Sequence, residues 1–134
     1  MTPAWRREEN MKGRILVVCQ DLMAASRLRN MLCAQEYMAH MAHMARRADD
    51  ALALLGFHHI DALIVNPCLQ DHDVQWLCSQ VSKRHPNLKK HMIFLADGEL
   101  PENVKAFVEE SGNDIVVSPI DAGQLEQVLS RHMR

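Results

Sequence analysis

At 134 residues the chain has the length of one compact domain, and its hydrophobic fraction of 48% is enough to build a single core. Its net charge of −2 gives no electrostatic basis for binding nucleic acid, which requires a strongly basic face. No apolar run approaches the roughly 18–20 residues that span a bilayer, and residues 1–10 lack the apolar segment of a secretory signal. We therefore expect a cytoplasmic protein that contacts neither a membrane nor nucleic acid.

The first half of the chain predicts three strands with helices between them. Arg14–Cys19 is almost continuously apolar and rich in β-branched residues, which is typical of a strand buried on both faces. Asp21 is placed to cap the helix that follows. Tyr37–Ala45 predicts a weaker second strand, and Gly56 is expected to end the next helix. Ala62–Val65 predicts a third buried strand.

The second half continues the alternation. A third helix is followed by a predicted strand at Met92–Leu95. Pro101 favours the start of a fourth helix and Gly112 its end. Ile115–Val117 predicts the fifth strand, and Asp121 is placed to cap the last helix. Strands that alternate with helices in this way predict an α/β domain whose parallel sheet is covered on both faces.

Residues 38–45 interrupt the pattern with a three-residue Met-Ala-His repeat. Clustered Met and His side chains suit a soft metal ion. On a strand, however, His40 and His43 would point to opposite faces, whereas on a helix they would be neighbours. We favour a local triplet duplication over a metal site.

The four cysteines show no CxxC spacing and lie in or beside apolar runs: Cys19, Cys33, Cys68 and Cys78. This arrangement favours reduced, mostly buried thiols over a disulfide framework or a zinc site.

Five β/α units that open with ILVV and contain DALIVN resemble the receiver domain of two-component response regulators over residues 13–133. The resemblance implies a doubly wound, five-stranded parallel sheet of order 2-1-3-4-5 with helices on both faces. It also implies a receiver-like domain at 13–134, preceded by a flexible extension at 1–12.

The residues that carry the chemistry of that family differ in this chain. Cys19 and Gln20 stand in place of the acidic pair, and Asn66 stands in place of the phosphate-accepting aspartate. Ala96 replaces the Ser or Thr after the fourth strand. Ser118 replaces the Lys of the Lys-Pro pair that follows the fifth strand in the family. The resemblance places all five at the carboxyl edge of the sheet, where the crevice of such folds lies.

These replacements remove the chemistry of phosphoryl transfer. Magnesium requires oxygen ligands, preferably carboxylates, and an amide is not a nucleophile toward a phosphoryl donor. We therefore expect no catalytic residue, no metal and no cofactor. The alternative is a rebuilt magnesium site from neighbouring acids, which more simply cap helices or lie in loops: Asp21, Asp71, Asp73 and Asp97.

The sequence therefore favours an atypical, non-enzymatic receiver that acts in signal transduction by phosphorylation-independent binding of a regulator, kinase or output domain. The alternatives are a redox sensor that uses Cys19 with Cys68, and a binder of a small ligand. By analogy with the family, a protein partner or a second copy would dock on the fourth helix, fifth strand and fifth helix. Charged residues on that surface are Lys105, Glu109, Glu110, Asp114 and Arg131. Trp76 is either an exposed anchor for a partner or folds onto neighbouring side chains.

Overall fold

The computed structural model describes residues 13–41, 47–69, 71–96, 98–117 and 120–132. The predicted N-terminal extension at 1–12 and the second half of the Met-Ala-His repeat lie outside these residues. The elements are β1 (Arg14–Val18), α2 (Leu22–Ala34), β2 (Met38–Met41), α3 (Ala48–Phe57), β3 (Ala62–Val65), α4 (Val74–Arg84), η1 (Pro86–Leu88), β4 (Met92–Ala96), α5 (Glu102–Ser111), β5 (Asp114–Val117) and α6 (Ala122–His132).

The strands form one parallel sheet with the order β2-β1-β3-β4-β5. The expected α/β class with a parallel sheet is confirmed, and the strand order is the one that the resemblance implied. β1 lies inside the sheet, where Val17 pairs with Met41 on one side and Ile64 on the other. Because β1 and β3 are adjacent while their helices leave in opposite directions, the crevice of the fold lies at their carboxyl ends.

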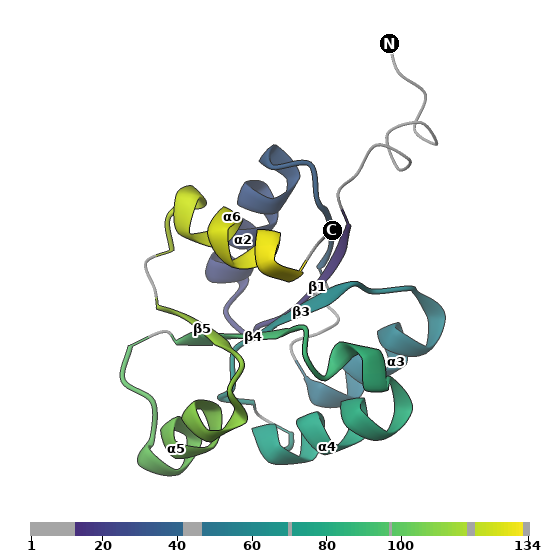
Figure 1. The fold of residues 1–134 in the computed structure, drawn as a ribbon, viewed down its shortest axis with the longest axis vertical. Coiled ribbons are helices and arrows are strands. Elements are labelled where there is room, and N and C mark those ends of the chain that lie inside the picture. Colours follow the sequence, from purple (N-terminus) through teal and green to yellow (C-terminus); the bar gives the residue numbers. More distant parts are fainter. Residues whose placement is uncertain (1–12, 42–46, 70, 97, 118–119, 133–134) are drawn as a thin grey trace.

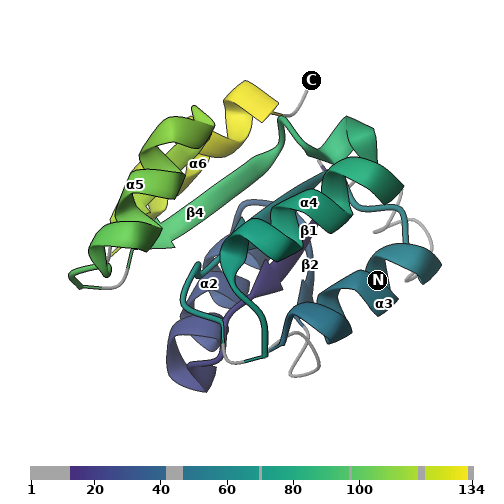
Figure 2. The same cartoon turned by 90° about the horizontal axis from the view of Figure 1, so that it is seen from below.

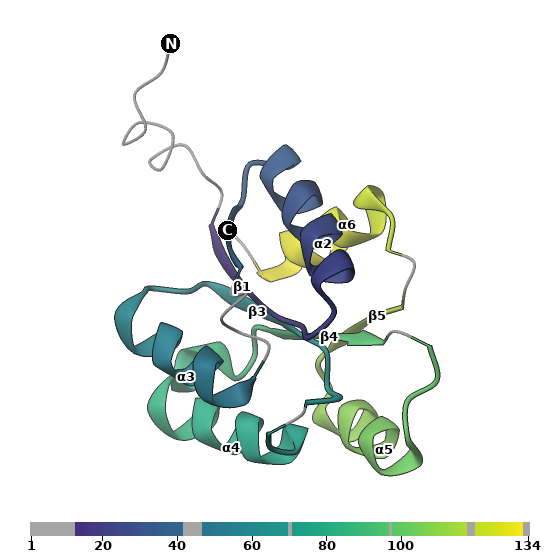
Figure 3. The same cartoon turned by 180° about the vertical axis from the view of Figure 1, so that it is seen from behind.

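Alternate residues of each inner strand enter two separate cores. On one face of the sheet, Leu16 and Val18 pack with α3, α4 and α5, which contribute Leu52 and Leu77 among others. On the other face, Ile15 packs with α2 and α6. Figures 1 and 3 show this division of the helices, and Figure 2 shows α3 and α4 side by side. The central strands are buried on both faces, as their unbroken apolar runs predicted.

Helix ends follow the predicted capping residues with one exception. The Asp21 carboxylate accepts hydrogen bonds from the backbone N–H of Met23 (3.0 Å), and Asp121 accepts one from Gln124 (2.6 Å). Gly112 closes α5 in the left-handed conformation, at φ 73°. The prediction that Gly56 ends its helix was wrong. Gly56 has no positive φ and lies inside α3, which continues to Phe57.

Two other boundaries differ slightly from the prediction. Pro101 precedes α5 and does not form its first residue. The predicted strand Tyr37–Ala45 is seen as β2 at Met38–Met41, and residues 42–46 lie outside the described ranges. Among the described residues, no helix is long and apolar enough to cross a membrane.

Candidate functional site

Three of the five predicted site positions line up along the carboxyl edge of the sheet. Cys19 follows β1, Asn66 follows β3, and Ala96 is the last residue of β4. The backbone N–H of Asn66 donates to the carbonyl of Val18 (2.8 Å), which joins the ends of β1 and β3 directly. Gln20 follows Cys19, and Ser118 lies outside the described residues.

The side chains at this edge are neutral and mostly engaged within the domain. The Asn66 side-chain oxygen accepts a hydrogen bond from the backbone N–H of Cys68 (3.0 Å), which forms a turn at the start of the β3–α4 loop. The Cys19 thiol is buried, and it donates to the carbonyl of Asp21 (3.6 Å between sulfur and oxygen). The Gln20 Oε1 atom is buried, and the described residues offer it no hydrogen-bond partner.

These side chains do not fit a magnesium ion. Mg²⁺ is held through carboxylates, phosphate oxygens and water in octahedral geometry. Here the positions at the ends of β1 and β3 offer a thiol and two amides, and the Asn66 amide oxygen is already bonded. The orphaned Gln20 Oε1 is one neutral oxygen, which cannot replace a carboxylate pair.

The nearby acids serve helix ends instead. Asp21 caps α2, and Asp73 caps α4 by accepting from the backbone N–H of Trp76 (2.7 Å). Asp71 accepts from the backbone N–H groups of Ala48 (2.9 Å) and Asp49 (3.1 Å) at the start of α3. Asp97 lies outside the described residues. The capping alternative for Asp21 and Asp73 is therefore observed.

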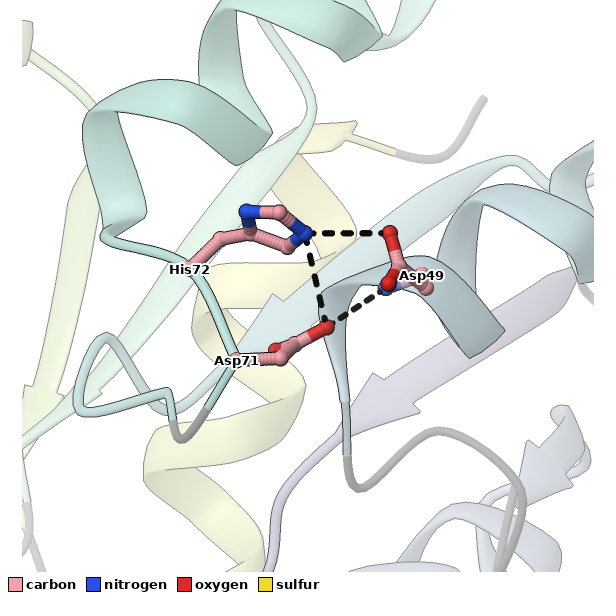
Figure 4. Close-up of side chains that lie close together, drawn as sticks. All are labelled: Asp49, Asp71 and His72. Carbon is pink, nitrogen blue, oxygen red and sulfur yellow. Dashed lines mark hydrogen bonds and ion pairs between the residues drawn. The ribbon is translucent and has the colours of Figure 1, made fainter.

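A group of three side chains that the sequence did not predict as a unit lies beside this edge. Asp49, Asp71 and His72 point toward one another, as Figure 4 shows. His72 Nε2 is 3.1 Å from Asp49 Oδ1 and 3.9 Å from Asp71 Oδ2. The His72 ring also stacks on Trp76, with centroids 3.6 Å apart. Trp76 thus folds onto a neighbour and is partly buried, so the stacked alternative is the observed one.

The electrostatics of this group favour an ionised Asp71. Burial of the carboxyl opposes its charge, but the backbone N–H donors of Ala48 and Asp49, together with His72, outweigh burial and lower the pKa of Asp71 below 3.8. Asp71 therefore ties the β3–α4 loop to the first turn of α3. The three residues are close in space because α3 and α4 begin at the same edge of the sheet.

The cysteines are free, as expected, but they are not uniformly buried. Cys19 is buried, whereas Cys33 is exposed on α2, which contradicts the expected burial for that residue. The apolar residues that flank Cys33 in the sequence suggested burial, but the Cys33 side chain lies on the outer face of the amphipathic helix α2. Burial raises the pKa of the Cys78 thiol to about 11, so little reactive thiolate forms there near neutral pH.

The predicted docking surface, formed by α5, β5 and α6, carries a groove that is lined by both apolar and charged residues. The groove has a volume of about 500 Å³ and lies between α5 and the ends of β4 and β5. Ile115 (39% exposed) and Val117 (56% exposed) line it. Of the predicted charged residues, Lys105 and Glu109 also line the groove. Asp114, in contrast, binds Arg131 within the domain, at 2.9 Å.

Comparison with known proteins identifies the fold. No protein-family model and no curated protein matches the sequence. The signal receiver domain of an HD domain-containing protein from Pseudomonas fluorescens is 24% identical, with a TM-score of 0.76 over 90% of this chain and 85% of that one. A CheY-like receiver domain protein from Methanospirillum hungatei is 20% identical, with a TM-score of 0.75 over 89% and 91%.

The receiver domain of a signal transduction histidine kinase from Syntrophus aciditrophicus is 22% identical, with a TM-score of 0.73 over 89% of this chain and 88% of that one. All three neighbours are signal receiver domains. The chain therefore has the fold of response-regulator receiver domains.

Proposed function

We propose that this chain is a degenerate receiver domain, which acts in signal transduction by binding a protein partner without being phosphorylated. The observation that carries the proposal is Asn66. It follows β3, where the receiver family has its phosphate-accepting aspartate, and its amide oxygen is already bonded to the backbone of Cys68. An amide at this position forms no acyl phosphate.

The neighbours of Asn66 support the same conclusion. Cys19 and Gln20 occupy the places of the acidic pair, Ala96 the place of the switch hydroxyl, and Ser118 the place of the lysine. Neutralisation of charge by a metal ion and fixed cations is the main contribution of such sites to phosphoryl transfer. None of these residue types supplies it. We infer that the domain is not an enzyme and that its signalling function requires no cofactor at this edge of the sheet.

We further propose that the groove between α5 and β5 is the docking surface. Ile115 and Val117 offer apolar contact area, and Lys105 and Glu109 lie at the groove for charge pairing. A second copy of the chain is one occupant that can be tested without knowing any other partner.

The proposal predicts that the wild-type chain takes no phosphoryl group from acetyl phosphate in the presence of Mg²⁺. It also predicts that the Asn66→Asp variant alone does not restore the reaction, because the acidic pair, the hydroxyl and the lysine are still missing. Intact-mass spectrometry after incubation would detect an added phosphoryl group as about 80 Da.

An ordinary receiver domain treated in parallel is the positive control for the donor. A phosphoryl adduct on the wild-type chain would disprove the degenerate-receiver proposal. An adduct on the Asn66→Asp variant alone would show that the remaining residues still support transfer, which contradicts the second half of the prediction.

A further inference from the structure

A cavity rich in histidine lies at the amino edge of the sheet, opposite Asn66. It has a volume of about 560 Å³ and is bounded by the α3–β3 connection, the segment from α4 to β4, and the end of α6. Five of the eight histidines of the chain line it: His58, His59, His85, His91 and His132.

Two of these histidines are already in direct contact. His91 lies just before β4 and His132 is the last residue of α6, and their Nδ1 atoms are 3.0 Å apart. The ring planes are nearly perpendicular, at 83°. The His132 side chain is only 9% exposed, so its position is set by the packing around it.

The second nitrogen of His132 fixes which atom faces His91. His132 Nε2 is 2.8 Å from Asp114 Oδ2, and a carboxylate accepts hydrogen bonds but does not donate them. In the neutral ring the proton must therefore be on Nε2, which leaves a lone pair on Nδ1. Arg131 holds the other oxygen of Asp114 (2.9 Å) and so keeps the carboxylate in place. The lone pair of His132 thus points at His91.

This carboxylate–histidine arrangement is the one that orients histidine ligands of metal ions. Two imidazole nitrogens bound to one tetrahedral ion, each at about 2.0–2.1 Å, are separated by about 3.4 Å. The observed 3.0 Å between the Nδ1 atoms is close to that separation. A metal ion would take the place of the proton that lies between the two Nδ1 atoms, and the two rings would move slightly apart.

We propose that His91 and His132 are ligands of a divalent transition-metal ion, with Asp114 as the positioning residue behind His132 and water in the remaining coordination positions. Neutral imidazole suits Zn²⁺, Ni²⁺ and Cu²⁺. Arg84 and Asp61 both line the cavity. The positive charge of Arg84 disfavours a bound cation, and the negative charges of Asp61 and Asp114 favour one. The site lies at the opposite edge from Asn66, so it is independent of the proposed signalling function.

The ion would fasten the end of α6 to the start of β4. In the metal-free chain the two rings meet across this junction, and Asp114 of β5 binds Arg131 and His132 at the end of α6. A ligand that binds only the folded state stabilises it in proportion to the logarithm of its free concentration. We therefore expect the melting temperature of the full chain to rise with added Zn²⁺.

The test measures Zn²⁺ binding to the full chain by isothermal titration calorimetry, after removal of metal with a chelator. We expect one Zn²⁺ per chain. The His91→Gln and His132→Gln variants should each bind at least about tenfold more weakly, and Asp114→Asn about 10–100-fold more weakly. Matched controls are His72→Gln, which alters the group with Asp49 and Asp71, and a His40→Gln, His43→Gln double variant, which alters the triplet repeat.

Metal-free thermal unfolding of each variant shows whether it folds, and His91→Gln provides the test if the buried His132 variant does not. Co²⁺ in place of Zn²⁺ reports nitrogen ligands through its visible absorption bands. Absence of Zn²⁺ binding by the wild-type chain would overturn the proposal. So would loss of binding in the His72 or His40/His43 controls with no change in the His91 variant.

Discussion

Asp71 joins the loop after β3 to the first turn of α3. Its two carboxylate oxygens accept the backbone N–H groups of Ala48 and Asp49, and its side chain is 6% exposed. α3 has no capping hydrogen bond from Arg47, the residue at its own N-terminal cap position. A residue from a different segment therefore performs the capping, and it joins two elements in doing so.

The Asp71→Ala variant should lower the free energy of unfolding by about 1 kcal/mol at neutral pH, the usual cost of losing an N-terminal cap. Because the pKa of Asp71 is lowered in the folded state, its contribution is present above pH 3.8 and is lost as the pH falls through the folded-state value. Urea unfolding at pH 7 and at acid pH measures both effects. Glu110→Ala, an exposed change on α5, is the control. An equal loss in both variants, or a difference from wild type that does not shrink in acid, would contradict this role.

At the scale of the elements, two glycines with open space around them occupy opposite conformations. Neither Gly56 nor Gly112 would bring an added Cβ within 4 Å of another atom. Gly112 closes α5 at φ 73°, whereas Gly56 lies within α3 without a positive φ. An added methyl group therefore meets open space at both positions, and the two substitutions differ in the backbone conformation that the new side chain must adopt.

Gly56→Ala should raise the free energy of unfolding by about 0.5–1 kcal/mol, because it removes freedom from the unfolded chain and suits the helix. Gly112→Ala should lower it by about 1–2 kcal/mol, because a side chain resists the left-handed conformation. Chemical denaturation of the two variants beside the wild type measures the difference. Equal effects of the same sign would show that conformation does not govern these positions.

These glycines also show what the sequence could and could not predict. Strand β3 was predicted at its observed bounds, and the cap at Asp21 was predicted from its residue type and position, because both depend on nearby residues. The end of α3 was not predicted, since Gly56 stops a helix only where the chain turns into a left-handed conformation. Helix α3 instead continues to the exposed Phe57.

The two clusters of polar side chains escaped prediction for another reason. His91, Asp114 and His132 come from the segment before β4, from β5 and from α6, and they meet only when α6 closes against the sheet. The group around Asp71 likewise joins residues more than twenty positions apart, at separations of 22 and 23 along the chain. In contrast, Cys19 and Asn66 could be placed together because strand ends in a parallel sheet share one edge.

At the scale of the whole molecule, the proposed docking groove can be tested through self-association. The Val117→Glu variant should weaken self-association of the chain at least about tenfold, because it places a charge in an apolar contact. Sedimentation velocity over a range of concentrations measures this. Phe57→Ser is the matched control, since Phe57 is an exposed apolar side chain (85%) on α3, on the other side of the domain from β5.

The wild-type chain and the Phe57→Ser variant should associate equally. A wild-type chain that stays monomeric at every concentration would exclude a second copy as the occupant of the groove. Equal weakening by both substitutions would show that association does not depend on this face.

The pairing of the strands has a consequence for how the chain folds as it is synthesised. β2 and β3 pair with β1, β4 pairs with β3, and β5 pairs with β4, so each strand joins one that precedes it in the chain. The sheet can therefore grow in the order of translation, because domains begin to fold from the N-terminus as they emerge from the ribosome. The helices on one face do not follow this order as closely. α2 covers part of the face that contains Ile93 early, but Leu125 and Leu129 of α6 come last, so until α6 emerges the rest of that face remains apolar and accessible to chaperones.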